Sequence, residues 1–199
     1  MTSARLRQAL DCIDEINRAD PHEILVRGKA RPKELTHAAM VSAWIERLRP
    51  DADDALRIAA RGHHVRRWAI PRGEYPPGRR GYLRWRQALQ ELHADTLEEV
   101  MTEAGYDRVV IARVQDLVRK RNLRRDPDVQ ALEDALCLVF LETQLGEFRT
   151  RQPDGRVAEI LRKTWDKMSA EARALAVELD LAPDDRRFLQ RVLRLGDAA

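Results

Sequence analysis

The chain has 199 residues, of which 44% are hydrophobic and 35% are charged, and its formal net charge is +3. This length suits one compact domain of ordinary size and not two full domains. No apolar run approaches the roughly 18 residues of a membrane span, and the first residues lack the apolar stretch of a signal peptide, so we expect a cytoplasmic protein without membrane contact. The two cysteines, Cys12 and Cys137, fall on or beside apolar helix faces, which is typical of reduced thiols and leaves no CxxC metal site.

Helical periodicity extends over nearly the whole chain. Apolar residues recur three and four positions apart and predict helices at 3–17, 34–48, 53–65, 79–104, 108–121, 127–147, 155–167, 170–179 and 184–195. Helix signals mark several of these ends: Gly105 after the fourth helix, Asp107 before the fifth, Asp126 and Pro127 at the sixth, and Ser169 at the eighth. Only residues 23–26 indicate a short extended piece, and prolines and glycines predict a loop at 68–78. We therefore predict an all-α fold.

The predicted helix at 127–147 carries the longest apolar run, from Ala135 to Leu141. Such a run covers nearly every side of a helix, which places this helix at the centre of a helical bundle. We expect a single domain over residues 1–199. Its core spans about 33–148, and a C-terminal helical extension at about 153–196 covers one side of that core.

Three polar residues stand where helical periodicity calls for an apolar side chain, namely His37, His63 and Asp134. Each lies on a stripe of apolar residues, as His37 does with Val41 and Asp134 with Leu138. An ionised carboxylate or an unpaired imidazole in such a position costs several kcal/mol unless it is paired, hydrogen-bonded or bound to a metal. We therefore expect the three side chains to be partners for one another in a buried site.

Basic residues gather in two segments of the chain. Residues 57–86 contain nine arginines and one acid, and residues 119–125 contain five basic residues and no acid. Clustered cations favour an anionic partner such as a phosphate, a nucleotide or a nucleic acid. The alternative is compositional, because 31 of the 36 basic residues are arginine, as in a chain from a GC-rich genome.

The order and spacing of the inward polar residues resemble those of the HD-domain metal-dependent phosphohydrolases. His37 stands 26 residues before His63, His64 follows directly, and Asp134 comes 70 residues later. In that all-α superfamily the matching side chains bind a divalent metal that activates water against a phosphate ester. The resemblance implies an HD-like five-helix core in which His37, His63, His64 and Asp134 are the metal ligands.

One position departs from the HD pattern, because His64 stands where the family has an aspartate. The resulting set of three imidazoles and one carboxylate suits a transition metal such as Zn, Mn or Fe better than Mg. Water of lowered pKa on that metal would be the nucleophile, and the arginines would neutralise the charge of the phosphate.

A second resemblance covers most of the chain. The stretches from His64 to Arg72, Gly81 to Arg86, Gly105 to Asp107 and Leu132 to Leu141 are similar to those of an uncharacterised helical family, the domain of unknown function 4202. That resemblance implies no particular reaction. Its pattern commonly has a Gln-His pair at the positions of His63 and His64 and a Tyr at that of His37, so it implies a site formed by His64, Arg67, Trp68, Arg72, Glu133 and Asp134.

Two functions of different classes agree with these features. The first is a metal-dependent phosphohydrolase for a nucleotide or another phosphorylated small molecule. Its metal ligands would be His37, His63, His64 and Asp134, its catalytic residues His64, Asp134 and Glu133, and its anion-binding residues Arg66, Arg67, Trp68, Arg72, Arg86 and Lys120. The second is a non-catalytic module that binds RNA or an acidic protein through residues 66–80, 79–104 and 119–125. Polar residues that point into the core favour the first function.

The candidate histidines and Asp134 also have purely structural interpretations. His37 can be a hydrogen-bonded core histidine, and His63 with His64 can be protonated rings stabilised by a helix dipole. Asp134 can hold Arg67 or Arg72 in a buried ion pair that fixes the proline-rich loop.

The remaining aromatic residues and histidines are weaker candidates. Trp68, Tyr82 and Trp85 are typical of core or loop packing, although aromatic rings among so many arginines can also stack a base. We interpret His22 and His93 as surface residues.

Overall fold

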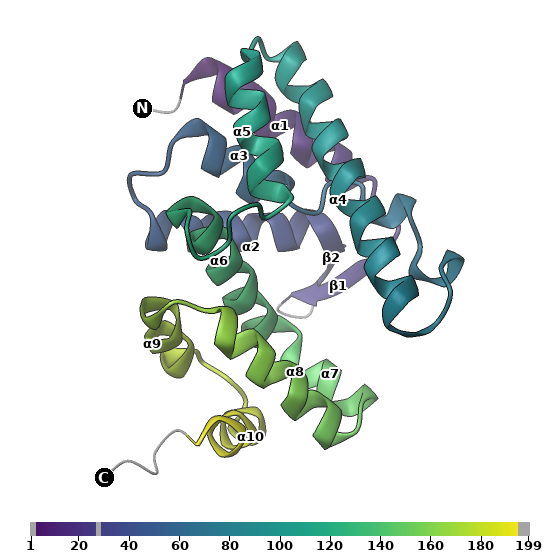
Figure 1. Ribbon diagram of the computed structural model, residues 1–199, viewed down its shortest axis with the longest axis vertical. Helices are drawn as coiled ribbons and strands as arrows, with labels where there is room; N and C mark the ends of the chain where they lie inside the picture. The colour runs from purple at the N-terminus through teal and green to yellow at the C-terminus, as the bar shows by residue number, and fades with distance from the viewer. Residues whose placement is uncertain (1–2, 27–28, 195–199) are drawn as a thin grey trace. The chain divides into compact units, whose positions relative to one another are not determined.

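The computed structural model describes residues 3–26 and 29–194, and this part of the chain is almost entirely helical (Figure 1). It contains one two-stranded sheet, and its other regular elements are α-helices and two short 3-10 helices. The predicted all-α class is therefore confirmed. No helix within these residues is both long and apolar enough to cross a membrane.

The chain forms two compact units, Met1–Leu132 and Glu133–Ala199. The boundary falls inside helix α6 (Pro127–Thr143). The expected single domain, with a core near 33–148 and an extension near 153–196, stays a prediction. All candidate histidines belong to the first unit, whereas Glu133 and Asp134 belong to the second.

The first unit is built around five α-helices, which are α1 (Ala4–Arg18), α2 (Lys33–Leu48), α3 (Asp54–Gly62), α4 (Gly78–Glu103) and α5 (Arg108–Val118). α4 lies beside α5, and α3 packs against α1, α2 and α5 (Figure 1). Their inner faces bury apolar side chains completely, among them Ile13, Val41, Ile58, Leu97 and Val114. Removal of these side chains from water is the main stabilising contribution to this unit.

A short hairpin leads into α2. Strand β1 (Glu23–Val26) is the extended piece that the sequence predicts, and β2 (Lys29–Pro32) pairs with it in antiparallel register. β2 was not predicted because its residues show no apolar alternation. Beside the hairpin, the buried carboxylate of Asp20 accepts the backbone N–H groups of His22 and Glu34, both at 2.9 Å. Asp20 thereby fixes the first turn of α2, and the His22 side chain is exposed as predicted.

Helix α3 ends at Gly62 and not near residue 65 as predicted. His63 is its C-cap, and Arg66 adopts a left-handed conformation with φ of 57° that turns the chain into the 3-10 helix η1 (Arg67–Ala69). Gly62 allows this end of α3 to approach α4 closely, because a Cβ atom there would lie 2.4 Å from Cδ2 of Leu97. This close approach places His63 inside the unit.

The loop between α3 and α4 follows the prediction for residues 68–78. It contains the end of η1 and a second 3-10 helix, η2 (Arg72–Glu74). The predicted signals at the next connection are also present. Gly105 has a left-handed φ of 77° after α4, and the Asp107 side chain accepts two backbone N–H groups in the first turn of α5.

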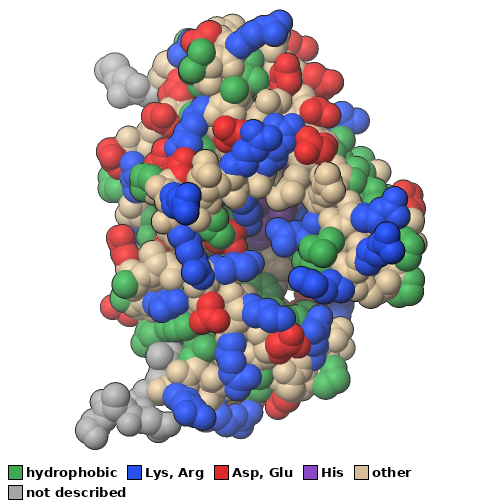
Figure 2. All heavy atoms as spheres, in the orientation of Figure 1, with side chains coloured by type: hydrophobic (Ala, Val, Ile, Leu, Met, Phe, Trp, Pro, Cys, Tyr) green, Lys and Arg blue, Asp and Glu red, His purple; other side chains and the backbone are tan. Residues whose placement is uncertain are grey.

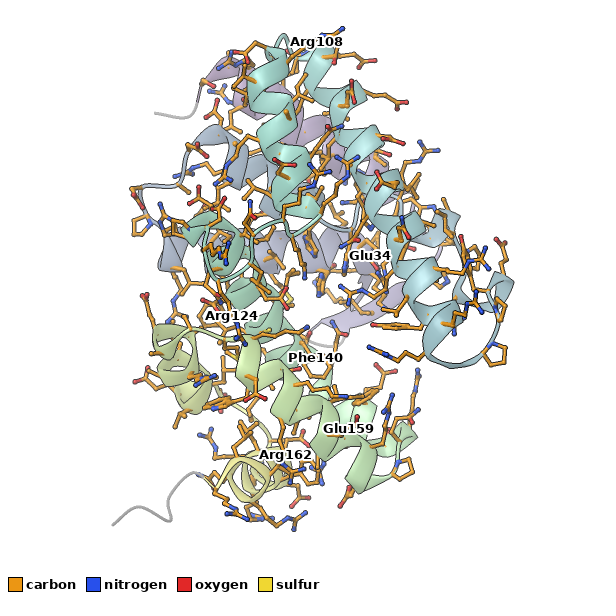
Figure 3. The ribbon with its side chains drawn as sticks, in the orientation of Figure 1. Glu34, Arg108, Arg124, Phe140, Glu159 and Arg162 are labelled. Carbon is orange, nitrogen blue, oxygen red and sulfur yellow. The ribbon has the colours of Figure 1, made fainter. Side chains whose placement is uncertain are left out.

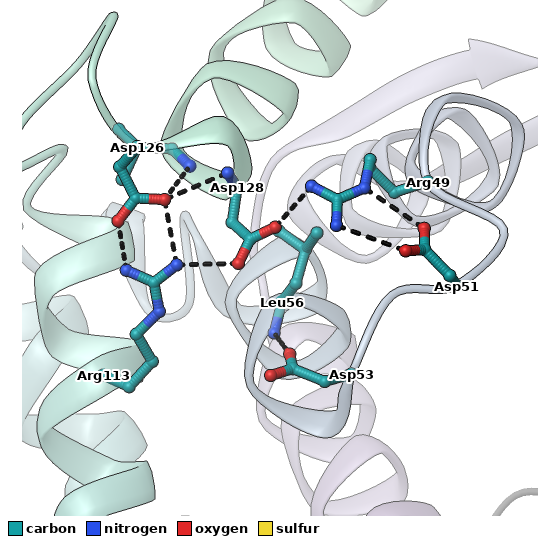
Figure 4. A network of polar contacts seen from close by, with 8 residues as sticks. Arg49, Asp51, Asp53, Leu56, Arg113, Asp126 and Asp128 are labelled. Carbon is teal, nitrogen blue, oxygen red and sulfur yellow. Dashed lines mark hydrogen bonds and ion pairs between the residues drawn. The ribbon is translucent and has the colours of Figure 1, made fainter.

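A network of ion pairs joins three segments of the first unit (Figure 4). Arg113 of α5 binds the carboxylates of Asp126 and Asp128 at the start of α6, and Asp128 binds Arg49 after α2 at 2.6 Å. Asp126 is the predicted cap of α6, since its Oδ1 accepts the backbone N–H groups of Asp128 and Val129. The start of α6 is therefore held by charge as well as by capping.

The second unit contains the end of α6 and four further helices, which are α7 (Leu145–Arg151), α8 (Asp154–Lys167), α9 (Ala170–Glu178) and α10 (Pro183–Leu193). The single helix predicted at 127–147 is wrong in length, because α6 stops at Thr143 and α7 follows. The helices predicted near 155–167, 170–179 and 184–195 are confirmed, although residue 195 lies outside the described residues. No residue from Ala135 to Leu141 is exposed, and neither Cys12 nor Cys137 forms a disulfide, as predicted.

Candidate metal site

Three histidines meet inside the first unit. His37, His63 and His64 each offer one ring nitrogen, and these atoms lie within 4.8 Å of one another. The ring centroids of His63 and His64 are 4.2 Å apart, and that of His37 lies 5.2 Å from both. His37 and His63 are only 7% and 5% exposed, whereas the His64 side chain is 29% exposed. The cluster is therefore closed toward the core and accessible at His64.

Two elements bring these rings together. His37 occupies the buried stripe of α2 with Val41 and Trp44, as predicted, and His63 follows the last turn of α3. On the face drawn in Figure 2, part of a histidine side chain is visible from outside between Lys and Arg side chains.

Hydrogen bonds indicate which nitrogen of each ring carries the proton. Nδ1 of His63 lies 2.8 Å from the carbonyl oxygen of Ala60, which can only accept, so Nδ1 of His63 donates. Nε2 of His63 therefore accepts a hydrogen bond from Nδ1 of His37 at 3.1 Å. Nδ1 of His64 lies 3.2 Å from Oε2 of Glu34, which leaves Nε2 of His64 for a ligand. Metal-binding histidines in proteins have this arrangement, with one nitrogen on the metal and the other donating to a carbonyl or a carboxylate.

Glu34 is a buried acid that was not among the predicted site residues. It lies at the start of α2 (Figure 3), is 5% exposed, and contacts His64 through one oxygen and Arg67 through the other, with Oε1 3.8 Å from Nε of Arg67. The sequence contains a signal for it, because Glu34 precedes His37 by three positions on the same stripe. Arg67, one of the two arginines suggested as a partner of Asp134, thus pairs with Glu34 in the first unit.

Burial keeps the three rings neutral. It lowers the pKa of His37 to about 4 and the pKa of His63 and His64 well below their usual value, and the charge of Arg67 acts in the same direction on His37 and His64. Burial also raises the pKa of Glu34 to about 7 against the opposing charge of Arg67. Neutral imidazoles have the lone pairs that a metal requires. Burial thus opposes the protonation of His63 and His64 at the end of α3.

His93 of α4 belongs to the same interior, and its prediction as a surface residue is wrong. It is 3% exposed, its Nδ1 lies 2.7 Å from the carbonyl oxygen of Val65, and its ring centroid is 5.9 Å from that of His64. Burial lowers the pKa of His93 to about 4. Helical spacing would have revealed this position, because Leu89 and Leu97 place His93 on a buried stripe.

Two of the predicted anion-binding residues act on the histidines through their positive charge. The charge of Arg67 lowers the pKa of His64, and the charge of Lys120 lowers the pKa of His63. Cζ of Arg67 is 4.8 Å from the centroid of the Trp85 ring, so a cation–π contact orients this guanidinium. The cluster thus has positive charge next to it.

Arg72, another of the predicted anion-binding residues, contacts the backbone of its own loop, and its role in anion binding stays a prediction. It donates to the carbonyl oxygens of Tyr75 at 2.8 Å and Pro76 at 3.0 Å, so it fixes the proline-rich loop through the backbone of that loop. The structure places the remaining three predicted anion-binding residues as follows: Arg66 is exposed, and Trp68 and Arg86 are half-buried.

Glu133 and Asp134 are buried in the second unit. Oδ1 of Asp134 accepts the backbone N–H of Ser169 at 2.9 Å, and Oε1 of Glu133 lies 3.2 Å from Nζ of Lys167. These contacts hold α6 to the connection between α8 and α9. The expected roles of Asp134 as a metal ligand and of both acids in catalysis stay predictions.

Comparison with known proteins gives one family. A family model described as a domain of unknown function, DUF4202, matches residues 7–188, which include the histidine cluster, Glu34 and both acids of α6. No curated protein and no solved structure matches the chain. The sequence motifs from His64 to Arg72 and from Leu132 to Leu141 had indicated the same family. The chain therefore belongs to the DUF4202 family.

Proposed function

We propose that this protein is a metal-dependent phosphohydrolase for phosphorylated small molecules, with His37, His63 and His64 as its metal ligands. One observation carries the proposal: three neutral histidine rings offer nitrogens within 4.8 Å of one another in a largely buried cluster. Three protein ligands and one position left for water are the donor set of catalytic zinc sites. Imidazole ligands suit a divalent transition metal such as Zn, Mn or Fe.

The distances agree with such an ion. Nitrogens that lie about 2.1 Å from a tetrahedral ion are about 3.4 Å from one another. Nδ1 of His37 and Nε2 of His63 are 3.1 Å apart and are joined by a hydrogen bond, which an ion would replace by displacing the Nδ1 proton of His37. The ligand atom of His64 lies within 4.8 Å of both. Ala60 and Glu34 would hold the orientation of the rings through their Nδ1 atoms.

The surrounding residues supply the other requirements of phosphate ester hydrolysis. A metal held by the three histidines would lower the pKa of water and so provide the nucleophile. Arg67 and Lys120 would neutralise the negative charge that develops on the phosphate. Arg67 is suited to this role because Glu34 and the Trp85 ring already orient it. Two cysteines without a disulfide support a cytoplasmic location.

Elemental analysis of the protein, purified without chelator, tests the proposal directly. We expect a stoichiometric transition metal in the wild type and its loss in His64→Gln, with a circular dichroism spectrum that shows both chains folded. His22→Gln is the matched control, because His22 is an exposed histidine outside the cluster. The metal-loaded wild type should hydrolyse p-nitrophenyl phosphate, and His64→Gln should not.

Two results would rule this function out. The first is a wild type that contains no metal and binds none on titration with Zn, Mn or Fe. The second is metal-independent binding of RNA that weakens steeply with salt, which would favour the non-catalytic module.

A further inference from the structure

The first turns of α4 carry a pair of aromatic rings next to the histidine cluster. The centroids of Tyr82 and Trp85 are 5.9 Å apart, with an angle of 43° between the ring planes. Arg67 contacts the Trp85 ring on one side and Glu34 on the other, and Glu34 contacts His64. A single arginine therefore separates the aromatic pair from the residues that orient the proposed metal ligands.

The two rings differ in exposure. Trp85 is 9% exposed and donates its indole N–H to the carbonyl oxygen of Ile70 at 2.9 Å, so it ties α4 to the preceding loop and has a structural role. Tyr82 is 43% exposed, and within residues 3–26 and 29–194 it is the only exposed aromatic side chain. An exposed aromatic ring offers a large apolar face on which a planar ligand can stack.

Positive charge flanks this exposed ring. Cζ of Arg86 lies 5.9 Å from the Tyr82 ring centroid, and Cζ of Arg67 lies 4.8 Å from the centroid of the neighbouring Trp85 ring. The guanidinium groups of Arg86 and Arg67 therefore lie beside the Tyr82–Trp85 pair of rings. Such a combination fits a ligand that is both planar and anionic.

We infer that Tyr82 stacks the base of a nucleoside monophosphate whose phosphate lies at the histidine cluster. This inference rests on the proposed function and names the substrate class of the same site. Arg67 connects the two places, because it pairs with Glu34, which binds His64, and it contacts the Trp85 ring beside Tyr82. A sugar phosphate would use the cations equally well but has no planar group for Tyr82.

Isothermal titration of the full chain with adenosine 5′-monophosphate and with glycerol 3-phosphate tests the inference. Base stacking on an aromatic side chain contributes about 1–3 kcal/mol, so Tyr82→Ala should weaken binding of the nucleotide about 5- to 140-fold. Tyr82→Phe should bind as the wild type does, because it keeps the ring. Neither variant should change the affinity for glycerol 3-phosphate. Leu83→Ala is the matched control, since Leu83 is exposed on the same turn and has no ring.

Two outcomes would overturn the inference: a wild type that binds the nucleotide no more tightly than glycerol 3-phosphate, or an equal loss of both ligands in Tyr82→Ala. Tyr82-dependent binding of a single-stranded oligonucleotide without binding of the mononucleotide would also overturn it, in favour of RNA. The titrations are repeated on chelator-treated protein. If the protein holds no metal, the proposed hydrolase function is wrong. The titrations on chelator-treated protein still decide whether nucleotide binding depends on Tyr82.

Discussion

Nε2 of His63 lies 3.1 Å from Nδ1 of His37, although 26 positions of sequence separate the two residues. The contact joins the end of α3 to the middle of the buried stripe of α2. A core has no need of such a pair, because two apolar side chains would fill the same space without removing polar nitrogens from water. The two buried imidazoles satisfy each other through this hydrogen bond, which agrees with the structural interpretation of His37. With His64 beside them, the same nitrogens form the group that can hold a metal ion.

Glu34 should strengthen metal binding without touching the metal. Glu34→Gln keeps the size of the side chain, but it weakens the hydrogen bond from Nδ1 of His64 and removes the charge opposite Arg67. We expect the affinity for Zn to fall about 10- to 100-fold, as for other changes to residues that orient metal-bound histidines. Competition with a chromogenic chelator measures this affinity. Glu46→Gln, on the exposed face of α2, should bind Zn as the wild type does. An unchanged affinity in Glu34→Gln would show that the carboxylate has no such role.

His93 should contribute to stability and not to metal binding. His93→Ala removes a buried ring and leaves the carbonyl oxygen of Val65 without its 2.7 Å partner, which together cost about 3 kcal/mol of unfolding free energy. The metal content should stay at the wild-type value, because the ligand atoms come from the other three histidines. Urea denaturation and elemental analysis of the same preparation measure both effects. Loss of the metal from a folded His93→Ala chain would instead place His93 among the ligands.

The close approach of α3 and α4 at Gly62 gives a prediction about packing. A Cβ at this position would lie 2.4 Å from Cδ2 of the fully buried Leu97, so Gly62→Ala should lower the free energy of unfolding by about 1–3 kcal/mol. Leu97→Ala removes the clashing side chain. Gly62→Ala should therefore lower the free energy of unfolding by less in a Leu97→Ala background than in the wild type. A double-mutant cycle measures this coupling. Additive effects of the two substitutions would contradict the steric explanation. In Gly155→Ala no atom lies within 4 Å of the new Cβ, so that helical control should not be destabilised.

The sequence predicts those parts of the fold that depend on spacing along one helix. His37 and His63 were found because each interrupts an apolar stripe, and Asp107, Asp126 and Ser169 were found because capping is local. The sequence does not predict a site role for Glu34, because an acid in the first turn of a helix is ordinarily explained by the helix dipole. Its burial results instead from the hairpin and from Asp20, which are contacts between distant parts of the chain.

Other features of the site depend on tertiary structure alone. The end of α3 at Gly62 is set by contact with Leu97, which lies on a different helix. The left-handed Arg66 then turns the chain so that Arg67 meets both Glu34 and Trp85. Periodicity along one helix cannot predict these contacts, since each contact joins residues of two elements that are separated by a loop.

The last prediction concerns acid stability and the network of Figure 4. The hydrogen bonds from Arg113 lower the pKa of Asp126 to about 2, against the opposing effect of burial. The folded-state pKa is thus below the unfolded value of 3.8, so the stabilisation is fully present above pH 3.8 and is lost as the pH falls toward 2. Because the Arg113 side chain is 34% exposed, solvent screening reduces the expected contribution to about 1 kcal/mol.

Asp126→Asn isolates the charge, because asparagine also caps a helix N-terminus and preserves the bonds to the first turn of α6. Urea denaturation at pH 7 should therefore show the variant about 1 kcal/mol less stable than the wild type, and the difference should shrink as the pH is lowered from 4 toward 2. Asp116→Asn is the control: its pair with Arg121 is exposed on both sides, so its effect should be small at every pH. A difference between Asp126→Asn and the wild type that stayed constant from pH 7 to pH 2 would mean that the ion pair with Arg113 is not its source.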